Sequence, residues 1–157
     1  MSDDLQTGDP APGFTLPRDG EGTISLADCA GRKLALYFYP RDDTSGCTAE
    51  AIAFNALMPE FDAAGAVVIG VSPDSVASHD KFKTKHGLAI PLAADPERSA
   101  IEAYGVWKEK SMYGRKYFGV ERTTFLIGRD GYSPDLMQRM KAQRVACLGY
   151  HKYPGAA

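Results

Sequence analysis

YPRDDTSGCTAE, residues 39–50, begins at the last residue of an apolar run over residues 34–39. It precedes a helix-forming segment over residues 51–58. Pro40 ends the apolar run, and a polar loop then leads to Cys47. The pattern predicts a strand, a tight loop and a helix, with Cys47 in the first helical turn. Unpaired N–H groups and the positive end of the helix dipole favour a thiolate there. Cys47 is therefore a candidate nucleophile, and the alternative is a buried structural cysteine.

The length and the net charge of the chain limit the classes of protein to which it can belong. The chain has 157 residues, which predicts a single domain over residues 1–157. Its 18 Lys and Arg against 20 Asp and Glu give a net charge of −2, which favours neither nucleic acid nor an anionic membrane as a partner. The sequence has no apolar run of the roughly 18 residues that a membrane span needs. The first residues lack the pattern of a signal peptide, so we expect a cytoplasmic protein.

The cysteines are Cys29, Cys47 and Cys147. Their number is odd, no C-x-x-C is present, and the spacing suits no metal site, so a disulfide scaffold is not expected. Cys29, in a predicted helical turn, is interpreted as a small inert residue. No metal, flavin or haem cofactor is called for.

Alternating strand and helix patterns predict an α/β fold. The predicted strands lie at residues 14–17, 23–26, 33–39, 66–71, 90–94 and 122–127. The first two form an N-terminal β-hairpin, and the strand at 90–94 is edge-like because it contains Pro91. A turn at residues 128–131 suits a second hairpin. Together these features indicate a mixed central sheet flanked by helices.

The helices carry their own boundary signals. Pro59 predicts a kink or break in the helix after Cys47. Asp95 followed by proline predicts a helix start at that point. His79 lies on a helix without an obvious partner, and we expect it on a solvated face. The aromatic-rich connection over residues 106–120 is interpreted as a solvated loop, the alternative being a lip over the site or a docking surface for a reductant.

The motif Pro40-x-x-x-Thr44-x-x-Cys47 resembles the peroxidatic loop of peroxiredoxins. The longer stretch at residues 37–48 resembles the peroxiredoxin Q, or bacterioferritin-comigratory-protein, group. Further segments that resemble this group lie at residues 8–16, 104–107, 112–115 and 122–127. The resemblance covers residues 8–131 and implies a thioredoxin-like fold.

Peroxide cleavage requires a thiolate, donors aimed at both peroxide oxygens and partial exclusion of water. Cys47 supplies the sulfur, and Thr44 can direct a hydroxyl at the incoming oxygen. Pro40 has no N–H, so it can shield the thiolate without competing for hydrogen bonds. Arg122 can supply fixed positive charge and a planar set of donors. The resemblance assigns these four residues the same roles.

Two charged residues, Arg122 and Glu50, each have a second possible role. Arg122 is expected to start a strand, where it could instead form only a surface ion pair. Glu50, one turn into the helix after Cys47, could hold Arg122 or could be a solvated residue on the helix face.

The sequence departs from the peroxiredoxin Q pattern at the resolving cysteine. The group often carries that cysteine five residues after the peroxidatic one, where this chain has Ile52, or on the next helix, near Lys83. Oxidised Cys47 must then be resolved by Cys29, by Cys147 or by an external thiol. We expect the external thiol and a one-cysteine enzyme, with Cys147 as the internal alternative.

The segment over residues 132–157 is atypical for the group. Ser133-Pro134-Asp135 predicts a helix start, and the following residues predict a helix that ends at Gly149 and carries Cys147 near its apolar face. If the group's last strand is missing, the sheet has an exposed edge.

The sequence thus predicts a thiol-dependent peroxidase that reduces hydrogen peroxide and small alkyl hydroperoxides through a cysteine sulfenic acid. Thioredoxin is the reductant that the resemblance implies, with glutaredoxin or a small thiol as substitutes, and we expect a monomer or weak dimer. The alternatives are a redox-sensing module that does not turn over and a thioredoxin-like thiol–disulfide module. The second lacks support because neither Thr44 nor Glu50 provides the other cysteine of a C-x-x-C.

Overall fold

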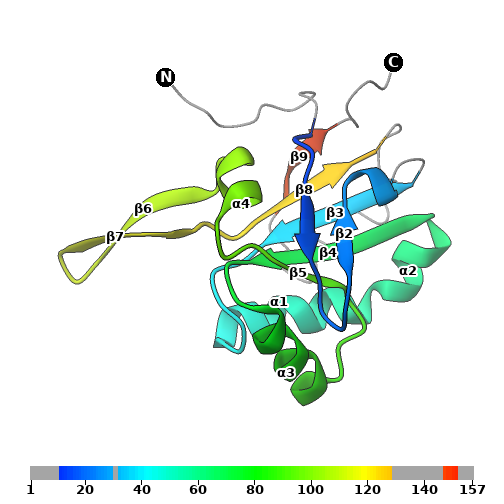
Figure 1. The fold of residues 1–157 in the computed structure, drawn as a ribbon, viewed down its shortest axis with the longest axis horizontal. Coiled ribbons are helices and arrows are strands. Elements are labelled where there is room, and N and C mark those ends of the chain that lie inside the picture. Colours follow the sequence, from blue (N-terminus) through cyan, green and yellow to red (C-terminus); the bar gives the residue numbers. More distant parts are fainter. Residues whose placement is uncertain (1–10, 30–31, 129–146, 152–157) are drawn as a thin grey trace.

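The computed structural model describes residues 11–29, 32–128 and 147–151. Its centre is a five-stranded sheet with strand order β5-β4-β3-β8-β9 (Figure 1). The strands are β3 (Lys33–Phe38), β4 (Ala66–Ser72), β5 (Leu92–Ala94), β8 (Thr123–Ile127) and β9 (Cys147–His151). The β3–β4, β4–β5 and β8–β9 pairs are parallel, whereas β3 and β8 are antiparallel. The mixed sheet of the α/β prediction is therefore confirmed.

Two hydrophobic cores cover the two faces of β3. The helices α1 (Ser45–Ala56), α2 (Met58–Ala63) and α3 (Val76–His86) lie along one side of the sheet in Figure 1. Tyr37 and Tyr39 pack on that side with Phe54 and Phe82. The opposite core holds the residues between them in the strand, such as Phe38, together with the N-terminal hairpin and α4 (Ser99–Ala103). This double burial explains why β3 shows little alternation of polar and apolar residues.

Several local predictions are confirmed. The strands β1 (Thr15–Pro17) and β2 (Thr23–Ser25) form the antiparallel N-terminal hairpin. Cys29 ends a 3-10 turn, η1 (Ala27–Cys29). The break near Pro59 separates α1 from α2, with the proline in the first turn of α2, where its missing N–H costs little. The strand β5 lies at an edge of the sheet.

The predicted helix start, with Asp95 as the cap and Pro96 as the first helical residue, is wrong by three residues. Arg98 adopts a left-handed conformation with φ of 62°, so the helix α4 begins only at Ser99. Asp95 nevertheless caps this helix, because its two carboxylate oxygens accept from the backbone N–H of Ser99 at 2.9 Å and of Ile101 at 2.8 Å.

The predicted solvated loop at residues 106–120 is also wrong. Antiparallel strands β6 (Trp107–Met112) and β7 (Arg115–Val120) form a hairpin that extends away from the central sheet (Figure 1). Tyr113 and Gly114 form its two-residue turn with positive φ values of 52° and 78°. The twist of such a turn matches that of the flanking strands. Of the aromatic residues in this segment, Trp107 lies on β6, Tyr117 and Phe118 lie on β7, and Tyr113 lies in the turn.

The C-terminal prediction needs a further correction. Residues 147–151 form β9, so a helix does not continue to Gly149. Because β9 runs parallel to β8, a tight hairpin cannot connect the two strands. The strand β9 also covers the edge of β8 that would be exposed if the last strand of the group were missing. The predicted helix over residues 133–146 and most of the predicted turn lie outside the described residues.

Candidate active site

Cys47 is the third residue of α1, as predicted, and it is only 4% exposed. Thr44 occupies the N-cap position with extended backbone angles. Its carbonyl accepts a hydrogen bond from the N–H of Thr48 at 2.8 Å, which closes the first turn around Cys47. The free N–H groups and positive dipole end of a helix are thus close to the Cys47 sulfur.

The Thr44 side chain does not cap the helix. Its hydroxyl donates to the carbonyl of Arg41 at 3.2 Å, and the residue is exposed. Pro40 is half-buried in a bend that follows β3 almost directly. Both predicted residues therefore belong to the short loop that connects β3 to the helix of Cys47.

Arg122 comes from a distant part of the chain. It precedes β8 rather than starting it, because the strand begins at Thr123. Its Nη1 atom lies 2.9 Å from the point that a Cβ on Gly46 would occupy. The guanidinium is therefore packed against the first turn of α1, one residue before Cys47.

Glu50 is buried one turn after Cys47, so its interpretation as a solvated residue is wrong. Its Oε1 atom lacks a hydrogen-bond partner among the described residues. Burial raises the pKa of Glu50 to about 7, and the positive charge of Arg122 opposes this rise. The carboxyl thus interacts with the guanidinium electrostatically, and its protonation state changes in the physiological range.

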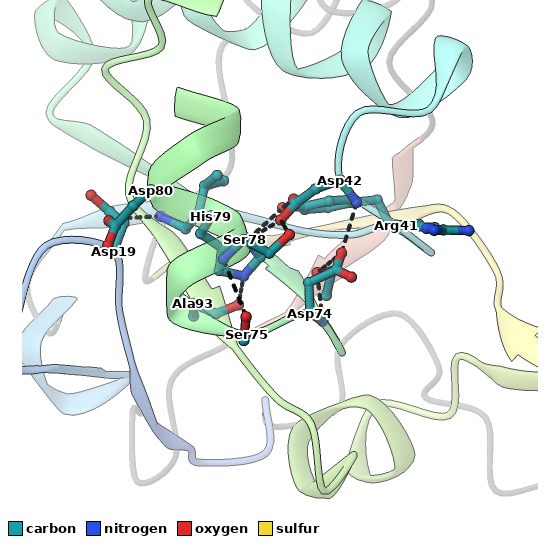
Figure 2. Close-up of polar contacts among 12 residues, drawn as sticks. Asp19, Arg41, Asp42, Asp74, Ser75, Ser78, His79, Asp80 and Ala93 are labelled. Carbon is teal, nitrogen blue, oxygen red and sulfur yellow. Dashed lines mark hydrogen bonds and ion pairs between the residues drawn. The ribbon is translucent and has the colours of Figure 1, made fainter. Parts of the chain in front are cut away.

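His79 is completely buried, so the prediction of a solvated face is wrong. Its Nδ1 atom lies 2.7 Å from Oδ2 of Asp42, and its Nε2 atom lies 2.9 Å from the carbonyl oxygen of Ala93 (Figure 2). The sequence contained a usable signal, because His79 lies three residues from both Val76 and Phe82 and therefore on their face of the helix. Asp42 gave no such signal, since its partners Ser78 and His79 are distant in sequence.

The next residue in the loop, Asp43, contacts the other end of the same helix. Its backbone is left-handed, with φ of 61°. Its carboxylate pairs with Lys85 at 2.7 Å and with His86 at 2.9 Å. Two consecutive aspartates thus connect the loop before Cys47 to the two ends of α3.

The other cysteines lie elsewhere. Cys29 belongs to the core on the opposite face of β3 from Cys47. Burial raises the pKa of its thiol, against the opposing effect of Arg32. Cys147 is the first residue of β9 and pairs in register with Thr124. At the two positions where the group often has a resolving cysteine, Ile52 is 48% exposed and Lys83 pairs with Asp19 at 2.7 Å.

Among residues 11–29, 32–128 and 147–151, no three or more His, Cys, Asp or Glu side chains are grouped so as to hold a metal ion. Within the same ranges, no helix has the length and apolar character needed to cross a membrane.

A buried cysteine at the start of the helix that follows a central strand, with an arginine just before the neighbouring strand packed against the same helical turn, is typical of a cysteine-dependent enzyme of the thioredoxin-fold class. Residues 7–132 match the model of the AhpC/TSA family. The chain is 47% identical over 134 residues to "Peroxiredoxin Bcp" of Xanthomonas campestris, covering 84% of each chain. It is 44% identical over 137 residues to "Putative peroxiredoxin bcp" of Coxiella burnetii, covering 87% of this chain and 91% of the relative.

A solved structure gives the same result. The Xanthomonas campestris bacterioferritin comigratory protein, whose structures concern alkyl peroxide reduction, superposes with a TM-score of 0.69 at 49% identity over 73% of each chain. The chain therefore belongs to the AhpC/TSA family, as a peroxiredoxin of the Bcp, or peroxiredoxin Q, group. It is a thiol-dependent peroxidase with a thioredoxin fold, as its sequence predicts.

Proposed function

We propose that Cys47 is the peroxidatic residue and that the enzyme reduces hydrogen peroxide and small alkyl hydroperoxides. The observation that carries this proposal is the placement of the Arg122 guanidinium against the helical turn that holds buried Cys47. Fixed positive charge at this point stabilises negative charge that develops during O–O cleavage. The relative from Xanthomonas campestris, named for alkyl peroxide reduction, supports the substrate class.

The reaction follows from these groups. The Cys47 thiolate attacks one peroxide oxygen, an S–O bond forms and the O–O bond breaks. The sulfur is oxidised to sulfenic acid, and the other oxygen leaves, takes up a proton and becomes water or an alcohol. Arg122 stabilises the peroxide oxygens, and the Thr44 hydroxyl contacts the attacked oxygen once it turns away from the carbonyl of Arg41, while Pro40 shields the sulfur. When ionised, the Glu50 carboxylate attracts the Arg122 guanidinium electrostatically.

We further propose that an external thiol resolves the sulfenic acid. The exposed side chain of Ile52 and the ion-paired Lys83 occupy the usual cysteine positions, and Cys29 faces the opposite core. Cys147 is the internal alternative. Thioredoxin is the proposed reductant, with glutaredoxin or a small thiol as substitutes.

Further proposals concern the domain organisation, location, oligomeric state and partners of the enzyme. We propose a single-domain cytoplasmic protein that is a monomer or weak dimer and binds neither nucleic acid nor membranes. The net charge of −2 supports the last point, because it provides no attraction to an anionic polymer or surface.

Peroxide consumption tests the proposal when it is followed with each candidate reductant in turn. Repeated turnover with the wild type and none with Cys47→Ser is the expected result. Turnover that survives in folded Cys47→Ser contradicts the site. A single stoichiometric oxidation without cycling under every reductant contradicts the proposed reductants.

A further inference from the structure

The loop before Cys47 has one side chain that points into the protein. Arg41, Asp43 and Thr44 are exposed, whereas Asp42 is only 8% exposed. Figure 2 shows its carboxylate directed at the first turn of α3. A buried carboxylate is costly unless it is paired and hydrogen-bonded, so its contacts need an explanation.

Both oxygens of the Asp42 carboxylate are satisfied. Oδ1 accepts from the hydroxyl of Tyr39 at 2.6 Å, and Oδ2 accepts from Ser78 Oγ at 2.8 Å and faces His79 Nδ1 at 2.7 Å. The Asp42 backbone N–H donates to Asp74 Oδ2 at 2.7 Å. One loop residue is thus linked to the end of β3, to the segment that follows β4 and to the helix α3.

Each ring nitrogen of His79 faces an acceptor. Its Nε2 lies 2.9 Å from the carbonyl oxygen of Ala93, which can only accept. Its Nδ1 faces the carboxylate of Asp42, so the ring donates at both nitrogens only when it is an imidazolium. The charged or titratable groups that face the ring are the Asp42 carboxylate and the Tyr39 hydroxyl, which is 3.4 Å from Nδ1.

Asp42 is correspondingly held as a carboxylate. Burial alone would raise its pKa, but hydrogen bonds from His79 and Tyr39, with the charge of His79 and the bond from Ser78, lower the pKa below its ordinary value. With the ring doubly protonated, the contact is a buried ion pair between a carboxylate and an imidazolium.

This pair is connected to the reacting groups through a short length of chain. Thr44, whose hydroxyl is proposed to contact peroxide, follows Asp42 by two residues, and its carbonyl closes the first turn of the helix that carries Cys47. The carbonyl of Arg41, immediately before Asp42, holds the Thr44 hydroxyl. A displacement of Asp42 is thus transmitted to the donor and to the start of α1.

We infer that His79, as a buried imidazolium paired with Asp42, is a positioning residue for peroxide reduction at Cys47. It fixes the loop over residues 40–44 so that the Thr44 hydroxyl and the first turn of α1 stay aligned for attack on the peroxide. This inference rests on the proposed function of Cys47. Loss of the imidazolium leaves a buried carboxylate without its countercharge, which favours displacement of the loop toward water.

The test compares two reactions of Cys47 in the variants His79→Gln and Asp42→Asn. Oxidation by hydrogen peroxide needs the aligned loop, whereas alkylation by neutral iodoacetamide needs only the thiolate. We expect peroxide oxidation to slow by roughly 10- to 100-fold, the range for a displacement of about 1 Å, while alkylation changes by less than about threefold.

The matched control is His86→Gln. It is the same substitution on the same helix and also removes a partner of a loop aspartate, but Asp43 is exposed and its pairing is screened by water. Both reactions of this variant should stay within about twofold of the wild type. A merely stabilising role of His79 is excluded by measuring rates where each variant is at least about 95% folded, since both reactions would then be unchanged.

A spectroscopic measurement keeps the inference testable if the variants unfold. In the wild type, nitrogen-15 NMR should show a proton on both ring nitrogens of His79 at neutral pH, and Tyr39→Phe, which leaves the pair intact, should show the same. A neutral His79 ring in the wild type overturns the inference, as does a folded His79→Gln that oxidises at the wild-type rate. Sulfenic acid that forms away from Cys47 in the wild type instead overturns the proposed function, and the ring spectrum is then unaffected.

Discussion

The guanidinium of Arg122 occupies the space beside Gly46 at the start of α1: its Nη1 lies 2.9 Å from the point that a Cβ on residue 46 would occupy. The glycine lies in a helix, where an alanine is favoured by about 0.8–1.0 kcal/mol. Its absence of a side chain therefore serves the position of the arginine rather than the backbone.

Gly46→Ala should accordingly separate stability from activity. The added methyl displaces the flexible end of Arg122, so the fold persists while peroxide oxidation of Cys47 slows by about 10- to 100-fold. Stopped-flow oxidation and chemical unfolding measure the two effects. Arg122→Met is the matched control, and adding Gly46→Ala to it should change the oxidation rate little. A second, equal loss of rate in the double variant contradicts a role for Gly46 through Arg122.

Glu50 should make stability depend on pH. Its folded-state pKa of about 7 is above the ordinary value of 4.5, so the folded protein binds this proton more tightly than the unfolded chain. The contribution is fully present below pH 4.5 and is lost as the pH rises through about 7. Glu50→Gln should remove this dependence.

Urea unfolding from pH 4.5 to 8 checks the prediction. The wild type should lose stability relative to Glu50→Gln as the pH rises. The free energy of unfolding of the variant, minus that of the wild type, should increase by up to about 3 kcal/mol over that range. Taking the difference cancels the opposite contributions of Asp19 and Asp42, whose pKa values are lowered. Parallel curves for the two proteins would show that Glu50 titrates normally.

Resolution by an external thiol predicts which cysteines are dispensable. Cys29→Ser and Cys147→Ser should each turn over peroxide at the wild-type rate with the same reductant. A disulfide requires Cα atoms within about 7 Å, and Cys29 lies in the opposite core. A peptide map without reductant checks this directly. A Cys47–Cys147 disulfide, within or between chains, would replace the one-cysteine mechanism and give the segment at 132–157 a catalytic role.

Local signals in the sequence predicted much of the fold. The strand β3 shows little alternation of polar and apolar residues because it is buried on both faces. Pro59 ends α1 because a proline has no N–H with which to continue the helical hydrogen bonds. The position of Cys47 in the first helical turn is likewise set by its immediate neighbours.

Several of the incorrect predictions concern burial or strand pairing that the local sequence does not show. His79 is buried because Asp42 reaches it from a different loop, and no property of the helix sequence supplies that partner. The strand β9 pairs with β8, whereas the sequence predicted that its first residues belong to a helix ending at Gly149. The hairpin at residues 107–120 was missed because its side chains are exposed on both faces of the ribbon and show no buried period.

The nucleophile is the central claim, and labelling of the sulfenic acid tests it most directly. One equivalent of hydrogen peroxide is added in the presence of dimedone, and the modified cysteine is identified by mass spectrometry of the wild type and of Cys47→Ser. We predict a single adduct on Cys47 in the wild type and none in the variant. An adduct on Cys29 or Cys147, with Cys47 unmodified, would contradict the assignment of Cys47 as the nucleophile.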